Sequence, residues 1–545
     1  MKFADLHCHP HTRAYMWLKA NVTKYQKEGL YHPWTIVASN MTRWKNAQRA
    51  IGYAQSDMVK LWNGRVKLVF NSIYPFERGF FVTPKKASIG GNQLLKNVAR
   101  VALKDGYPLR SWFQGVFMRL PLNTIAHVRS KQYDYWKELQ KEYNFIIKDS
   151  GQQKQNEIIL PGVPRRIFEN RERKRNKHPN HAHAEGKYII PKDHAELEAC
   201  LRDKGEPITM VLSIEGAHVF NPENADATEL TKRIQHVKRN WAYPVFFITL
   251  AHHFNNFLCG HAMSFPDMAK YAMSQDDAVN EGFTDLGWIA IRELLSLTAN
   301  NEKTQNASYR ILLDMKHMSA KARLEYYDNI VRPCYAKKDV IPVILSHAGY
   351  SGVGTLRELI ERYPLEGDHN ITENEYGSYY ANNINFCDED VLIVAQTGGL
   401  IGLCFDRRIL GRHKRMEEGQ TDFGALWSNI KSMLQVICRQ AGSTKKDWQK
   451  AWSYFCIGSD FDGYIDPVSG FKTALDFEAF ARVLLDQIKR EIKAGDTAHC
   501  ICCFDEEFTP EKAVEGIAYQ NAEDFVRKNY PKKRVNLKSE DYGAI

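Results

Sequence analysis

The segment Phe3-Ala4-Asp5-Leu6-His7-Cys8-His9, near the start of the 545-residue chain, predicts the type of fold. It has the character of a short buried strand that ends in two histidines separated by one residue. Because alternate side chains of a strand point to the same side, both imidazoles can bind one divalent metal ion at the mouth of a barrel. The segment therefore predicts a barrel that carries a metal at the ends of its strands.

Seven later segments also read as short, β-branched strands, and they alternate with helical sequence. The predicted strands are 65–73, 208–215, 245–251, 310–317, 340–347, 399–405 and 454–460. Helical patterns cover 286–297, 320–331 after a Ser319 cap, 388–395 before a Gly398-Gly399 stop, and 510–529. Eight strands alternating with helices predict a (β/α)8 TIM barrel, and strand ends that carry metal-binding or acid–base side chains predict one of the metal-dependent hydrolase type. In such barrels the reactive side chains lie at the C-terminal ends of the strands.

Two connections are longer than a minimal barrel requires. Residues from about 75 to 206 separate the second and third strands, which predicts large helical insertions. A second excursion, about 352 to 386, follows the sixth strand and is rich in Asn, Tyr and Gly, so we expect it to cover the site as a lid. We expect residues 1–545 to form a single metallohydrolase barrel domain with these additions.

The charge and cysteine patterns argue against several kinds of partner. Lys and Arg number 74 and Asp and Glu 64, and residues 151–187 alone hold nine of the basic residues against four acidic ones. No stacking aromatics are interleaved there, so a solvated insertion is favoured over a nucleic-acid surface. The eleven scattered cysteines and the lack of a secretory leader predict a cytoplasmic protein. No apolar run approaches the ~20 residues that cross a bilayer, so no membrane partner is expected.

The ends of the later strands carry further candidate metal ligands. Glu215 closes an apolar strand, and its two oxygens suit bridging two ions roughly 3.5 Å apart. A single Glu at a strand end is more often structural, and a single His is more often a packed core residue. His317 and His347 end two neighbouring predicted strands, however, and together they are candidate ligands of a second ion. Imidazole and carboxylate ligands fit zinc, with manganese, iron or cobalt as alternatives.

Two further strand ends carry candidate catalytic groups. Asp460 ends the eighth strand, where it can hold the attacking water and transfer its proton. Asp462 is interpreted as a turn residue, because Asp-Gly sequences are common in turns. After the fourth strand, either His252 or His253 can stabilise the oxyanion that forms when water attacks a carbonyl, and His252 is preferred.

These motifs resemble those of the membrane dipeptidase (renal dipeptidase, peptidase family M19) family of zinc peptidases, within the amidohydrolase superfamily. The motifs that carry the resemblance are Ile214-Glu215-Gly216, Thr249-Leu250-Ala251-His252 with Asn255, Leu313-Asp314-Met315-Lys316-His317, Leu345-Ser346-His347 and Ile457-Gly458-Ser459-Asp460-Phe461-Asp462-Gly463.

The resemblance implies a role for each site residue. His7 and His9 would bind the first zinc ion, Glu215 would bridge the two ions, and His317 and His347 would hold the second. His252 would face the tetrahedral carbon of the substrate, Asp460 would handle the proton, and Arg357 would hold the substrate carboxylate. The family has His-x-Asp at its first motif, whereas this chain has His7-Cys8-His9, and this departure puts the dipeptide specificity in question.

The sequence therefore predicts a hydrolase that uses two divalent ions, first of all Zn²⁺, and a bridging hydroxide to cleave a dipeptide or a related amide. One alternative is an amidohydrolase that acts on a lactone, a cyclic amide or another non-peptide substrate. The other is a non-catalytic barrel scaffold that binds an acidic partner through its basic insertion. A small-molecule substrate is the expected partner, and the sequence leaves a homodimer open.

Overall fold

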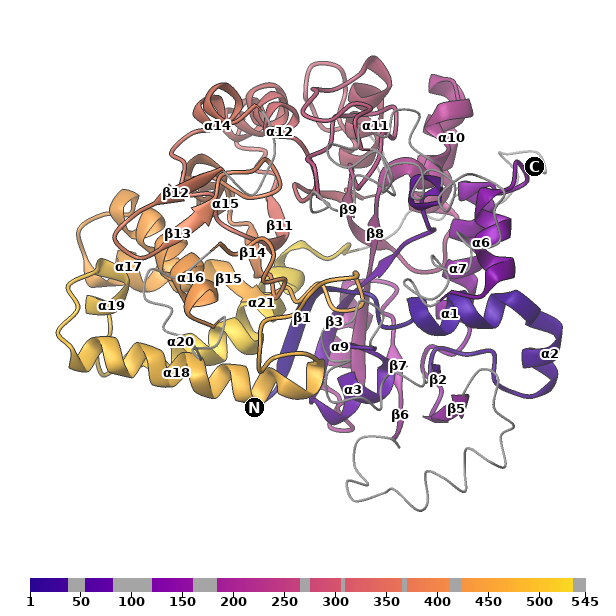
Figure 1. Cartoon of the computed structure of the whole chain (residues 1–545), viewed down its shortest axis with the longest axis horizontal. Coiled ribbons are helices and arrows are strands. Elements are labelled where there is room, and N and C mark those ends of the chain that lie inside the picture. Colours follow the sequence, from indigo (N-terminus) through magenta and orange to yellow (C-terminus); the bar gives the residue numbers. More distant parts are fainter. Residues whose placement is uncertain are drawn as a thin grey trace, which may run out of the picture.

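Eight parallel strands form a barrel at the centre of the computed structural model (Figure 1). The model describes residues 1–37, 54–81, 120–159, 184–264, 275–304, 309–364, 370–411 and 423–532. The strands follow the order of the sequence around the sheet. They are β1 (Phe3–Cys8), β3 (Val66–Ile73), β8 (Ile208–Glu215), β9 (Val245–Thr249), β10 (Leu312–Asp314), β11 (Ile344–Ala348), β14 (Leu400–Leu403) and β15 (Phe455–Ile457).

The first strand and the segment after the last strand close the barrel. Cys8 and Phe461 form a parallel bridge, the backbone N–H of His9 donates to the Phe461 carbonyl at 3.0 Å, and that of Asp460 donates to the His7 carbonyl at 2.9 Å. The predicted (β/α)8 TIM barrel is thus confirmed, as are its eight strands. Several strands are shorter than predicted, so that His317 and Asp460 each lie three residues beyond the end of a strand.

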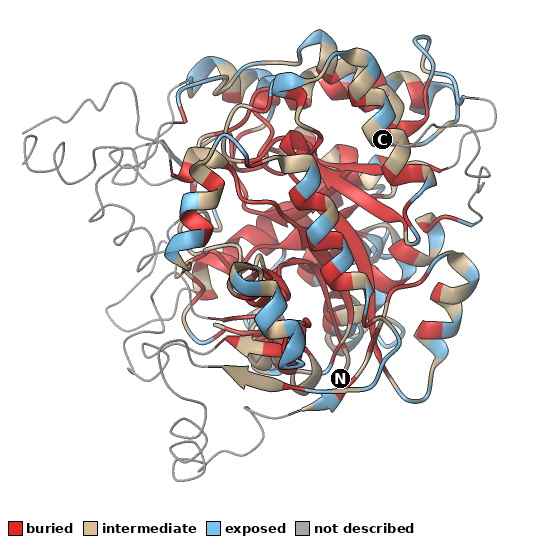
Figure 2. Ribbon diagram, turned by 90° about the vertical axis from the view of Figure 1, so that its right-hand side faces the viewer, coloured by how far each residue is buried: buried red, intermediate tan, exposed pale blue. Residues whose placement is uncertain are grey.

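Helices surround the barrel and shield its strands from solvent. Figure 2 shows buried strands in the interior and helices whose outer faces are exposed. The principal covering helices are α9 (His194–Arg202), α10 (Ala227–Arg239), α11 (Asp285–Leu295), α12 (Ala320–Tyr326), α15 (Asp388–Thr397), α16 (Phe423–Gln440), α17 (Lys445–Ala451), α18 (Phe477–Lys493), α20 (Pro510–Glu515) and α21 (Asn521–Asn529). None of the helices in the described ranges has both the length and the apolar character needed to cross a membrane.

Local signals that were read from the sequence begin and end some of these helices. The Ser319 side chain accepts a hydrogen bond from the Ala322 N–H at the start of α12, and Gly398 ends α15 at a φ of 64°. The predicted helix over 320–331 continues past α12 as one π-helical turn, Tyr327–Val331. Helices and a similar π-helical segment, Gly516–Gln520, also fill the predicted 510–529 region.

The long connection between β3 and β8 adds helices and short strands to one side of the barrel. Its described part contains α6 (Leu122–Arg129), α7 (Tyr135–Ile147), β4 (Lys154–Gln155), β5 (Glu157–Ile159), β6 (Glu185–Gly186) and β7 (Tyr188–Ile189). Figure 1 shows α6 and α7 beside α1 (Thr12–Leu18) and α2 (Val22–Lys27). Most of the basic stretch, residues 160–183, lies outside the described residues.

The predicted lid-like excursion contains α14 (Leu356–Arg362) and a hairpin of β12 (Ile371–Glu373) and β13 (Ser378–Tyr380). Residues 365–369 of this excursion lie outside the described residues. Its final part returns to the barrel, where the carbonyl oxygens of Asn383 and Asn385 accept hydrogen bonds from the buried Arg323 of α12. A covering role for the excursion stays a prediction.

Candidate metal centre

The C-terminal ends of five barrel strands bring six of the predicted site residues together. They are His7, His9, Glu215, His317, His347 and Asp460. Glu215, at the end of β8, lies between the histidines. His7 Nε2 is 3.1 Å from its Oε1, and His9 Nε2 is 3.0 Å from its Oε2. These side chains are almost fully buried, so the carboxylate and the imidazoles interact with little competition from water.

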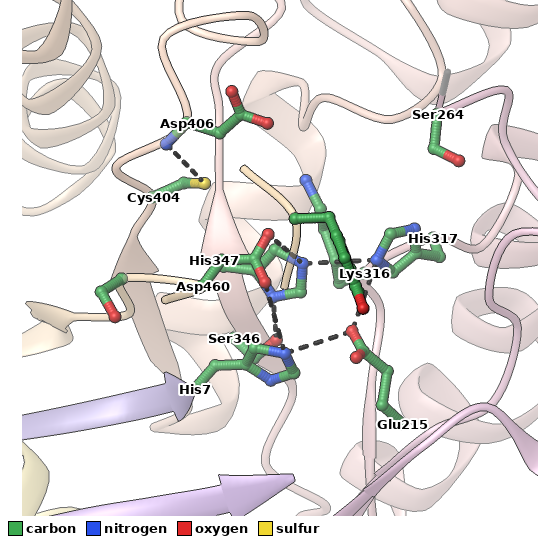
Figure 3. Close-up of polar contacts among 12 residues, drawn as sticks. His7, Glu215, Ser264, Lys316, His317, Ser346, His347, Cys404, Asp406 and Asp460 are labelled. Carbon is green, nitrogen blue, oxygen red and sulfur yellow. Dashed lines mark hydrogen bonds and ion pairs between the residues drawn. The ribbon is translucent and has the colours of Figure 1, made fainter. Parts of the chain in front are cut away.

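His317 and His347 lie on the other side of this carboxylate. The Nε2 atom of His317 is 3.5 Å from Glu215 Oε1 and 3.3 Å from Nε2 of His347. Asp460 completes the group, with its carboxylate oxygens 3.9 Å from His7 Nε2 and 3.8 Å from His347 Nε2. Figure 3 shows His7, Glu215, His317, His347 and Asp460 converging on one small space.

The donor atoms have the spacing of metal ligands. Three sets of three donors each lie within 4.8 Å of one another: His7, His9 and Glu215; Glu215, His317 and His347; and His7, His347 and Asp460. The Nε2 atoms of His7 and His9 are buried and make no hydrogen bond, although a carboxylate oxygen is close to each. Tetrahedral zinc sites separate neighbouring ligand atoms by about 3.3 Å, given ligand bonds of 2.0–2.1 Å. The residues therefore fit divalent ions.

Hydrogen bonds at the opposite ring nitrogen orient two of these imidazoles. The Ser346 hydroxyl donates to Asp314 Oδ2 at 2.6 Å, so it accepts from Nδ1 of His347 at 2.8 Å. His9 Nδ1 lies 3.1 Å from the Ser72 carbonyl oxygen, which can only accept. Both rings thus carry their proton on Nδ1, and this leaves the Nε2 lone pair for a metal.

A buried carboxylate below His317 and His347 ties three strands together. Asp314, at the end of β10, accepts hydrogen bonds from Thr249 Oγ1 of β9 at 2.7 Å and from the Ser346 N–H of β11 at 2.9 Å. Asp5 of β1 has the same role at the closure of the barrel, where it accepts from the N–H of Ser459 at 2.9 Å. These contacts hold the strand ends that carry the candidate ligands in fixed positions relative to one another.

The charges of Glu215, His317 and His347 match the needs of a metal site. His7 differs, because Glu215 and Asp460 raise its pKa to about 9 against the effect of burial, so a bound metal must displace its proton. Burial alone would raise the pKa of Glu215, but His7, His252 and His9 hold it well below its usual value, so the group is a carboxylate. Burial and the neighbouring His252 lower the pKa of His317 to about 3, and burial and His7 lower that of His347 well below its usual range. Both imidazoles are therefore neutral, which is the form that binds a metal.

Asp460 differs from Glu215 in its electrostatics. Burial raises the pKa of Asp460 well above its usual value, with Glu215 and Asp406 also raising it and His7 opposing them. Its backbone is left-handed at φ 59°, and so is that of His317 at φ 65°. Residues other than glycine adopt this conformation at a cost, and such residues are concentrated at functional sites. Both side chains are thus presented by strained turns just beyond short strands.

His252 lies beside the cluster and is held by a glutamate that the sequence reasoning missed. Its Nε2 is 3.6 Å from Glu215 Oε1, and its Nδ1 is 2.6 Å from Oε2 of the buried Glu77. The same carboxylate accepts from the Phe254 N–H at 3.2 Å and from the Tyr74 hydroxyl at 3.2 Å. Glu77 lies four residues beyond β3, at the start of the predicted insertion, so no strand-end pattern marked it.

The remaining candidates lie apart from the cluster or have another role. Asp462 accepts hydrogen bonds from the Gln55 N–H and from both the N–H and the hydroxyl of Ser56, which agrees with its interpretation as a turn residue. Arg357 is exposed on α14 and is not part of the buried cluster, so its contact with a substrate stays a prediction. His253 joins His252 and His317 in a fourth group of donors within 4.8 Å.

The chain is similar to several solved metal-dependent enzymes. One is a family M19 dipeptidase, with 13% identity and a TM-score of 0.48. Another is a metallo peptidase from Rhodobacter sphaeroides liganded with a phosphinate mimic of the dipeptide L-Ala-D-Ala, with 13% identity and a TM-score of 0.45. Each match covers 97% of this chain and 99% of the solved chain. An amidohydrolase from Pseudomonas aeruginosa (10% identity, TM-score 0.36) covers 91% of this chain and 95% of the other. No family model matches the sequence, and no curated protein is significantly similar. Because these likenesses are remote, we base the function on the site itself.

Proposed function

We propose that this protein is a metal-dependent hydrolase with a binuclear, zinc-preferring centre that cleaves the amide bond of a dipeptide or a closely related compound. The observation that carries the proposal is the position of Glu215 between two pairs of histidines, with Asp460 within 4 Å of one member of each pair. His7 and His9 would hold one ion, His317 and His347 the other, and Glu215 would bridge them.

Two ions held in this way would polarise the substrate carbonyl and lower the pKa of a bound water. Asp460 would accept the proton of the attacking water and pass it to the leaving amine. Burial raises the pKa of Asp460, which makes its carboxylate a stronger base toward the proton of the attacking water. Its side chain is 14% exposed, which makes it more accessible than the candidate ligands of this centre.

His252 would stabilise the oxyanion formed during the attack. Because Glu77 binds its Nδ1, the positively charged imidazole is favoured, and its Nε2–H can donate to the developing charge. The environment agrees with this role, since Glu215 and Glu77 raise the pKa of His252 against the effect of burial.

Metal analysis and substrate turnover test the proposal together. We expect about two ions per chain in purified protein and hydrolysis of L-Ala-L-Ala or L-Ala-D-Ala. The variant Asp460→Asn should retain its metal and lose about 10²- to 10⁴-fold in kcat, which is the usual contribution of a general acid–base group. One ion per chain would contradict a bridging Glu215. Metal-loaded protein that cleaves lactones or cyclic amides but no dipeptide would reject the peptidase assignment.

A further inference from the structure

Lys316 is a buried cation that the proposed mechanism does not use. It lies between Asp314, at the end of β10, and the candidate ligand His317, and its residue is only 2% exposed. Its ammonium donates to the carbonyl oxygen of Ile384 at 3.4 Å, a long hydrogen bond. Within the described ranges it forms no ion pair with a carboxylate. Figure 3 shows Lys316 alongside His317, at the edge of the cluster that faces Cys404 and Asp406.

The acidic groups around Lys316 have other partners. Asp314 accepts hydrogen bonds from the hydroxyls of Thr249 at 2.7 Å and Ser346 at 2.6 Å. Arg408 neutralises Asp406, with Nε 2.9 and 3.0 Å from the two carboxylate oxygens and Nη2 2.6 Å from Oδ2. Asp460 faces the Nε2 atoms of His7 and His347. Cys404 is a buried thiol, which burial keeps protonated by raising its pKa, so it supplies no negative charge.

A buried ammonium without a paired anion is unfavourable, and a bound anion relieves this cost. We propose that Lys316 binds the free carboxylate of the substrate. This assignment rests on the proposed function and narrows the substrate class to compounds with a carboxylate near the scissile amide, such as unblocked dipeptides. A carboxylate held there would lie beside His317, where it can fix the carbonyl relative to the metal centre. Lys316 therefore takes the role that the sequence assigned to the exposed Arg357.

The carboxylate preference of the unmodified enzyme is the first test. L-Ala-L-Ala and L-Ala-D-Ala are compared with their C-terminal amides, which differ only in the charged group. We expect kcat/KM for the better acid to exceed that for its amide at least 100-fold. Equal turnover of acid and amide would overturn the assignment of Lys316 and leave the proposed function intact. Turnover of none of the four compounds by metal-loaded enzyme would instead reject the proposed function.

Variants then locate the preference. Lys316→Met should raise KM for the acid at least 10-fold and change KM for the amide less than twofold, with kcat and metal content unchanged. Lys316→Arg, which keeps the positive charge, should restore part of the affinity for the acid. Lys321→Met, at an exposed lysine of α12, is the matched control and should bind the acid normally, and Arg357→Met tests whether that exposed arginine holds the carboxylate instead. A raised KM in Arg357→Met, or the same loss for acid and amide in Lys316→Met, would overturn the proposal. If Lys316→Met does not fold, Lys316→Arg provides the test, because a guanidinium cannot occupy the same position as the ammonium. An unchanged KM for the acid and the amide, and an unchanged preference for the acid, would contradict a role for Lys316 in binding the carboxylate.

Discussion

At the scale of single residues, the position of His252 depends on one buried carboxylate. Glu77 uses both of its oxygens, since Oε2 faces His252 Nδ1 and the Tyr74 hydroxyl and Oε1 accepts from the Phe254 N–H. His252 therefore receives its orientation and a favourable charge from a loop that follows a different strand. Glu77 is a positioning residue, because it acts on the reaction only through His252.

We expect Glu77→Gln to lower kcat about 10- to 100-fold and to leave metal content unchanged. This is the usual effect of losing a residue that hydrogen-bonds to an active-site side chain and orients it. An amide cannot stabilise the charged imidazole as a carboxylate does. In a His252→Ala background the same substitution should lower kcat almost no further. Steady-state kinetics of the unmodified protein, the two single variants and the double variant can measure this. Glu223→Gln, at an exposed position, serves as the control. Additive losses in the double variant would mean that Glu77 acts by another route.

At the scale of elements, α7 of the insertion is joined to the segments that follow β1 and β3. Glu142 of α7 is buried, and its Oε1 lies 2.6 Å from His11 Nε2 and accepts from the Tyr74 N–H at 3.1 Å. His11 Nδ1 in turn lies 2.8 Å from Asn71 Oδ1 of β3. The insertion is thus held against the barrel by a buried contact of the Glu142 carboxylate just beyond His7 and His9.

Glu142→Ala should lower the free energy of unfolding by about 3–5 kcal/mol, because it leaves the buried imidazole of His11 without its acceptor. Chemical denaturation measures this change. Asn144→Ala, at an exposed position of the same helix, should stay within about 0.5 kcal/mol of the unmodified protein. Equal midpoints for the two variants would show that α7 does not depend on the contact.

At the scale of the whole molecule, the barrel and most of the cluster could be predicted because their signals are local. Each strand is a short apolar run, and His7, Glu215 and His347 lie within the strands whose ends meet at one rim. The partners of these residues could not be predicted, because Glu77 and Glu142 approach from loops and helices whose paths no local pattern fixes. Arg357, which the spacing suggested for the substrate carboxylate, is exposed on α14, and its contact with a substrate stays a prediction.

The metal centre should also stabilise the entire barrel, because its candidate ligands come from β1, from β8, from the segment after β10 and from β11, which are far apart in the chain. Ions that bind only the folded state add about 4.1 kcal/mol when their concentration is a thousand times Kd. We expect chelation to lower Tm and zinc to restore it, as measured by thermal unfolding with metal analysis of the same samples. His347→Ala should reduce this response, whereas His236→Ala, on α10 away from the cluster, should keep it. An unchanged Tm after proven loss of both ions would mean that the apo cluster is already as stable as the loaded one, and the ions would then contribute only to the chemistry.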